Sequence, residues 1–84
     1  MIPNNITSSH IISAIRHIGR DGVPPLRKST RYDLLYDGRR YPPKYVVSIA
    51  NSYANREELN PYYFSGGPET NDFLRKQGFE IAEK

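Results

Sequence analysis

The chain of 84 residues contains no cysteine and no long apolar run. Without cysteine it can form neither a disulfide framework nor a thiolate metal site. A secreted domain of this size usually needs such cross-links, so we expect a cytoplasmic location. No segment approaches the roughly 20 apolar residues of a membrane span, and the N-terminus lacks the uninterrupted apolar stretch of a signal peptide. We therefore expect no membrane partner.

The signatures of common enzymes are also missing. The sequence has no Gly-x-Ser-x-Gly motif, no phosphate-loop lysine motif and no carboxylate cluster typical of a nuclease. His10 and His17 lie seven residues apart, too far for a shared metal ion on one helix, and we expect neither to have an acidic neighbour at a useful spacing. These absences predict a non-catalytic module that uses neither a metal nor a cofactor.

Apolar residues make up 37% of the chain and charged residues 25%, values that are ordinary for a small globular domain. A chain this short has room for one core. We therefore treat residues 1–84 as a single module.

Positive charge is concentrated in one part of the chain. Residues 16–44 carry eight basic and three acidic residues, a net charge of +5, whereas residues 45–84 carry four basic and six acidic residues, a net charge of −2. The basic residues of the first part are Arg16, Arg20, Arg27, Lys28, Arg31, Arg39, Arg40 and Lys44. This asymmetry favours a face for an anionic partner, with chance clustering on a solvated surface as the alternative.

The apolar spacing predicts an α+β domain with the order α-β-β-α-α-β, in which a β-hairpin and a C-terminal strand form a small antiparallel sheet packed with three helices. The helices are expected over residues 8–20, 44–55 and 68–77, and the strands over residues 31–36, 39–41 and 79–82. Loops fill residues 22–30 and 56–67.

Four local signals set the boundaries of these elements. Thr7 is a natural N-cap, and Gly78 suits the left-handed position after the third helix. Asp37-Gly38 predicts a two-residue hairpin turn, because that turn needs positive φ at both positions. Pro42 ends the second strand, since proline cannot donate to the sheet.

The predicted core combines the inward faces of all these elements. Its members are Ile11, Ile15, Ile18, Leu34, Val46, Ile49, Tyr53, Phe64, Phe73, Leu74, Phe79 and Ile81. On the second helix the periodicity predicts an outer, solvated face. That face consists of Lys44, Ser48, Asn51 and Asn55.

Two features indicate contact with an anion. Arg39 and Arg40 follow the hairpin tip and Arg31 lies at its base, an arrangement that can grip a phosphate backbone; the alternative is protection of an edge strand by positive charge. Lys44 lies in the first turn of a helix, beside backbone N–H groups that already favour an anion. A rigid proline corner with a solvated lysine is the alternative there.

Gly66-Gly67 precedes the third helix and permits two interpretations. Adjacent glycines allow several N–H groups to point into one phosphate-binding concavity. A tight loop that plugs Phe64 into the core is the simpler interpretation.

Several of these motifs together resemble a known family. The run YDLLYDGRRYPPK over residues 32–44, the FSGG of residues 64–67, and the later Asn71, Leu74 and Gly78-Phe79 are similar to the amino-terminal head domain of McrA-like restriction enzymes, which carry a carboxy-terminal HNH nuclease. The resemblance covers residues 7–82, and its most specific part is the YPPK-to-FSGG pairing. It implies that residues 1–84 are the N-terminal domain of a longer protein, an accessory module at the front of a larger nuclease that acts on modified or foreign DNA. The HNH motif itself is absent from the chain.

We therefore expect the domain to bind double-stranded DNA, modified DNA included, as the targeting module of a restriction endonuclease. Most phosphate contacts are assigned to Arg31, Arg39, Arg40 and Lys44, with Arg27, Lys28, Arg16 and Arg20 in support.

The alternative is a protein-interaction or homodimerisation module built on exposed tyrosines, namely Tyr45, Tyr62 and Tyr63. Tyrosine and arginine are both enriched at protein interfaces, so composition does not separate the two hypotheses.

Overall fold

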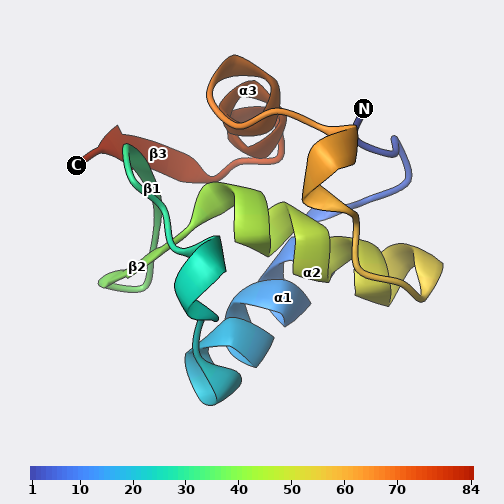
Figure 1. The fold of residues 1–84 in the computed structure, drawn as a ribbon, viewed down its shortest axis with the longest axis horizontal. Coiled ribbons are helices and arrows are strands. Elements are labelled where there is room, and N and C mark those ends of the chain that lie inside the picture. Colours follow the sequence, from blue (N-terminus) through green and yellow to red (C-terminus); the bar gives the residue numbers. More distant parts are fainter.

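Helix α2 (Pro43–Asn55) runs through the middle of the molecule in the computed structural model, which describes all 84 residues (Figure 1). Helix α1 (Ser8–Asp21) packs along one side of α2, and helix α3 (Pro68–Lys76) lies on the other side. Two single 3₁₀ turns, η1 (Pro25–Arg27) and η2 (Pro61–Tyr63), interrupt the segments that were expected to be plain loops. The order α-β-β-α-α-β and the α+β class are confirmed.

The sheet has three short antiparallel strands in the order β2-β1-β3. They are β1 (Tyr32–Tyr36), β2 (Arg39–Tyr41) and β3 (Glu80–Glu83). Tyr36 pairs with Arg39 across the turn, where Asp37 has φ 50° and Gly38 has φ 76°. The two-residue hairpin with positive φ at both positions is therefore confirmed.

The helix ends follow the local signals. Thr7 precedes α1, and its backbone N–H donates to Nδ1 of His10 at 3.0 Å, so a histidine takes the place that glutamate has in most capping boxes. After α3, Gly78 has φ 94°, and the N–H of Phe79 donates to the carbonyl of Leu74 at 3.0 Å. This pattern is the Schellman motif, in which the glycine turns the chain directly into β3.

The core forms where α1, α2 and the sheet meet, and most of its predicted members are buried. Phe73 and Phe79 are partly buried and pack against it. Tyr53 was wrongly placed in the core: its side chain is 45% exposed, and its ring packs edge-on against His17 of α1. A tyrosine at the rim of a helix pair can keep its hydroxyl in water, which the periodicity alone does not reveal.

The predicted outer face of α2 is also corrected. Ser48 and Asn51 are buried, because residues 56–60 fold back along the helix and cover them. The hydroxyl of Ser48 donates to the carbonyl of Leu59 at 2.8 Å, and the amide of Asn51 donates to the carbonyl of Glu57 at 2.8 Å. Helix α2 is thus surrounded on nearly every side, and its polar residues serve as anchors for a loop.

Two glycines should respond to alanine in opposite directions. Gly78→Ala should lower the free energy of unfolding by about 1–2 kcal/mol, because its positive φ is unfavourable for any L side chain although space is open around it. Gly19→Ala should raise it by about 0.5–1 kcal/mol, since Gly19 lies inside α1 and the new methyl group would make an ordinary 3.7 Å contact with Tyr41. Urea unfolding followed by circular dichroism measures both. A neutral or stabilising Gly78→Ala would contradict the capping geometry.

Candidate nucleic-acid interface

An open groove of about 390 Å³ lies between three segments that are distant in sequence. Residues 26–32 form one wall, the proline corner and Lys44 form the floor, and parts of residues 61–71 form the opposite wall. Four basic side chains line the groove, and no acidic residue does. They are Arg27, Lys28, Arg31 and Lys44. We call this feature the basic groove.

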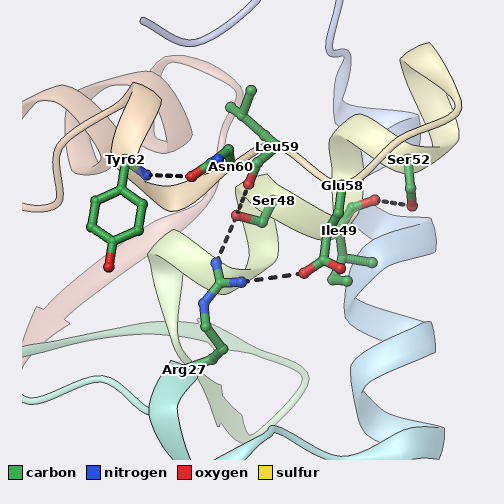
Figure 2. Close-up of polar contacts among 8 residues, drawn as sticks. All are labelled: Arg27, Ser48, Ile49, Ser52, Glu58, Leu59, Asn60 and Tyr62. Carbon is green, nitrogen blue, oxygen red and sulfur yellow. Dashed lines mark hydrogen bonds and ion pairs between the residues drawn. The ribbon is translucent and has the colours of Figure 1, made fainter.

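Arg27 is largely covered, with 19% of its side chain exposed. One of its terminal nitrogens donates to the hydroxyl of Ser48 at 2.7 Å, and the other donates to a carboxylate oxygen of Glu58 at 3.2 Å (Figure 2). Its guanidinium also lies 4.9 Å from the centre of the Tyr45 ring. Arg27 therefore ties η1 to α2 and to the loop after it, with its charge already paired.

Tyr45 belongs to this buried cluster. It was expected on an exposed interface, and this expectation is wrong, because only 7% of it is exposed. Burial raises the pKa of its phenol, and the nearby carboxylate of Glu58 adds to the effect. The guanidinium of Arg27 covers one face of the ring, so the ring is not free for a partner.

The other three cations of the groove have no carboxylate within 4 Å. The ammonium of Lys44 lies 5.0 Å from the centre of the Phe64 ring, and the guanidinium of Arg31 lies 5.6 Å from the centre of the Tyr32 ring. Aromatic faces attract these cations without neutralising them. Lys28, Arg31 and Lys44 therefore keep their charge available to an anion.

The two hairpin arginines lie outside the basic groove and differ from each other. Arg40 donates to a carboxylate oxygen of Asp33 at 3.1 Å, and the hydroxyl of Ser29 donates to the other oxygen at 2.8 Å. Asp33 is only 4% exposed, so these two groups satisfy a buried charge. Arg39 is exposed and has no acidic partner. Of the pair, Arg39 alone presents a free charge.

The two remaining predicted residues, Arg16 and Arg20, lie on helix α1 and do not line the groove. Arg16 is exposed without an acidic partner, whereas Nε of Arg20 lies 3.4 Å from the carboxylate of Asp21. The expectation that no acid accompanies the histidines is wrong: Nε2 of His17 lies 3.5 Å from Asp21, and its Nδ1 lies 3.3 Å from the Tyr53 hydroxyl. The four-residue spacing on a helix was the signal for this pair.

The FSGG segment is held by the first turn of α3. The N–H of Ser65 donates to the carboxylate of Glu69 at 2.7 Å, a bond that lowers the pKa of Glu69, and the hydroxyl of Thr70 donates to the carbonyl of Ser65 at 2.6 Å. Phe64 is buried. Because a side-chain carboxylate occupies the position where a phosphate would bind, the tight-loop interpretation is the one that the structure favours.

The YPPK and FSGG segments nevertheless meet in the groove. A Cβ atom on Gly66 would lie 3.9 Å from Cδ of Lys44, and the Phe64 ring lies beneath the lysine ammonium. Gly66, Thr70, Asn71 and Tyr62 all line the groove, and none of them was among the residues assigned to phosphate contacts. Tyr62 was expected only on a protein interface, and Gly66 only in one of the two interpretations of the glycine pair. Only the joint appearance of the two motifs in one sequence pointed to this contact.

No three His, Asp or Glu side chains gather as they would around a metal ion, and none of the helices has the length and apolar character needed to cross a bilayer.

The fold and the paired motifs place the chain in a class of small head domains that stand at the front of restriction enzymes. Residues 4–83 match the model of the ScoMcrA-like N-terminal head domain, and the chain belongs to that family. No curated protein matches the chain.

Among solved structures, the chain is similar to one described as the Type IV phosphorothioation-dependent restriction endonuclease ScoMcrA. The identity is 27% and the TM-score 0.67, and the match covers 96% of this chain and 13% of that one. The resemblance deduced from YPPK and FSGG is confirmed. The chain spans only a small part of the length of that enzyme.

Neighbouring arginines on the hairpin should differ in their effect on stability. Arg40→Ala leaves the buried Asp33 carboxylate with a single hydroxyl partner, so it should lower the free energy of unfolding by about 1–3 kcal/mol. Arg39→Ala should change it by less than about 0.5 kcal/mol, as surface substitutions usually do. Chemical denaturation of both variants measures the difference. Equal changes in the free energy of unfolding for the two variants would mean that the Arg40–Asp33 pair does not stabilise the fold.

Arg27 and Lys28 provide a second matched pair, at the groove itself. Arg27→Ala removes the contacts with Ser48 and Glu58 and should lower the free energy of unfolding by about 1.5–3 kcal/mol. Lys28→Ala should have little effect, because Lys28 has no carboxylate partner. Thermal unfolding followed by circular dichroism compares them. A fully stable Arg27→Ala variant would show that Arg27 does not fasten the groove wall.

Proposed function

We propose that the domain binds double-stranded DNA as the accessory or targeting module of a restriction-type HNH endonuclease. The observation that carries this proposal is the basic groove: four cations and no acid line it, in a head domain whose family belongs to restriction endonucleases. Proteins that hold DNA use arginine and lysine to contact phosphates, and each contact releases counterions.

We rank the residues proposed to contact phosphates by whether an acid already pairs with them. Lys28, Arg31 and Lys44 supply free charge inside the groove, and Arg39 extends it from the hairpin. Arg27 and Arg40 add to the local field, but their ion pairs with Glu58 and Asp33 reduce their share. Arg16 and Arg20 on α1 remain supporting contacts for a long duplex.

The module is proposed to be non-catalytic, with cleavage assigned to a nuclease domain elsewhere in a longer cytoplasmic protein. We further propose that this enzyme acts on modified DNA. The similar solved structure is described as phosphorothioation-dependent, which supports modification dependence for the whole enzyme rather than for this module by itself.

A protein-interaction or homodimerisation role is the second candidate. It is supported by exposed apolar side chains, Leu26, Tyr62 and Tyr63, although Tyr45 no longer contributes. An aromatic interface responds little to salt, whereas binding through phosphates weakens steeply as salt rises. Salt dependence therefore separates the two functions.

The Arg31→Ala/Lys44→Ala double variant should flatten the salt dependence of DNA binding. If each residue meets one phosphate, the slope of log affinity against log salt should fall by about one unit per lost contact, equally for all sequences. A fluorescence titration with a labelled duplex at several salt concentrations measures the slope, and circular dichroism confirms folding.

The control is Arg75→Ala/Lys76→Ala at the end of α3, in the acidic half of the chain and outside the groove lining. It removes the same number of charges and should leave the slope nearly unchanged. If the control is the more damaging of the two, the binding face lies elsewhere. If the unmutated chain shows no salt-sensitive binding, the interaction module replaces DNA binding as the function.

A further inference from the structure

Tyr62 is an exposed aromatic side chain whose position is nevertheless fixed. Its backbone N–H donates to the side chain of Asn60 at 2.9 Å, and it lies inside the η2 turn between Pro61 and Tyr63. Its side chain is 93% exposed, and in Figure 2 the ring stands free of the polar contacts around it. An aromatic ring held in water by a rigid backbone is poised to cover an apolar surface at a small entropic cost.

Tyr62 is a lining residue of the same groove as the three free cations. A ligand that satisfies both must therefore carry a flat apolar face and a negative charge close together. At about 390 Å³ the groove falls in the size range of sites for small ligands and is much too small to admit a duplex. A single nucleotide has this combination of size, flat base and phosphate.

We propose that the basic groove holds one unpaired nucleotide of bound DNA, with its base stacked on Tyr62 and its phosphate between Lys28, Arg31 and Lys44. This inference rests on the proposed function and adds to it the form of DNA that is recognised. The duplex on either side would lie on the outer surface, while one nucleotide leaves the stack and enters the groove. Stacking on an exposed aromatic ring beside a basic track is how proteins hold unpaired bases without reading their sequence.

The phosphate of the nucleotide also explains why the groove has no acidic lining residue, because an acid there would repel it. The hydroxyls of Thr70 and Ser29 already donate to the carbonyl of Ser65 and the carboxylate of Asp33, so neither has a proton left to donate to the ligand. An acidic peptide would satisfy the cations but offers no flat ring for Tyr62 unless it also carries an aromatic residue.

The test compares two labelled duplexes of the same sequence, one fully paired and one with a single bulged nucleotide at its centre. Fluorescence anisotropy with the 84-residue chain should show tighter binding to the bulged duplex. Tyr62→Ala should weaken binding to the bulged duplex about five- to hundredfold and change binding to the paired duplex little. Tyr62→Phe keeps the ring and should retain the preference.

Tyr63→Ala is the matched control. Tyr63 is the next residue and is 66% exposed, but it does not line the groove, so this variant should behave like the unmutated chain. Circular dichroism of each variant excludes unfolding as the cause of lost binding.

Two results would overturn the inference while leaving the proposed function intact. One is equal binding of the paired and bulged duplexes; the other is a preference for the bulge that survives Tyr62→Ala. If neither duplex binds, the proposed function fails as well. In that case a labelled peptide of alternating glutamate and tyrosine that binds and depends on Tyr62 would assign the groove to a protein partner instead.

Discussion

The hydroxyl of Ser48, buried in the middle of α2, accepts a hydrogen bond from Arg27 and donates one to the carbonyl of Leu59. The Ser48 hydroxyl therefore joins the η1 turn to the loop that follows α2. A buried hydroxyl without partners would be unfavourable, so this contact and the two segments stabilise each other. Because η1 begins the first wall of the basic groove and the loop after α2 leads into the opposite wall, the distance between the two walls depends on the Ser48 contact. Binding surfaces built from loops need such fixed supports.

The same region shows how a structure sorts charges that look alike in a sequence. Arg27 and Arg40 are both paired with carboxylates and hold loops or strands in place. Lys28, Arg31 and Lys44 lack acidic partners, and two of them rest against aromatic rings. A run of basic residues therefore contains both structural cations and cations available to a ligand. The presence of an acidic partner separates the two kinds, whether that acid is buried, as at Asp33, or half exposed, as at Glu58.

Signals confined to a few neighbouring residues predicted the structure best. The Asp37-Gly38 turn, the proline start of α2 and the glycine cap at residue 78 each follow from backbone preferences that no distant contact alters. Periodicity failed on α2, since the loop that returns along its polar face buries Ser48 and Asn51. The four cations of the groove were all among the predicted residues. Tyr62 could not be foreseen as their neighbour, because its place depends on how the loop after α2 folds over the helix.

The central position of β1 in the sheet has a consequence for synthesis of the chain on the ribosome. β2 follows β1 after two residues, but β3 begins only at Glu80, more than forty residues later. At about 5–20 residues per second, one edge of β1 therefore stays unpaired for several seconds after the hairpin has emerged. Unpaired edges invite pairing with other chains, and a charge within the strand opposes it. Asp33, at the second position of β1, places a carboxylate on this hairpin that opposes such pairing until the finished fold buries it.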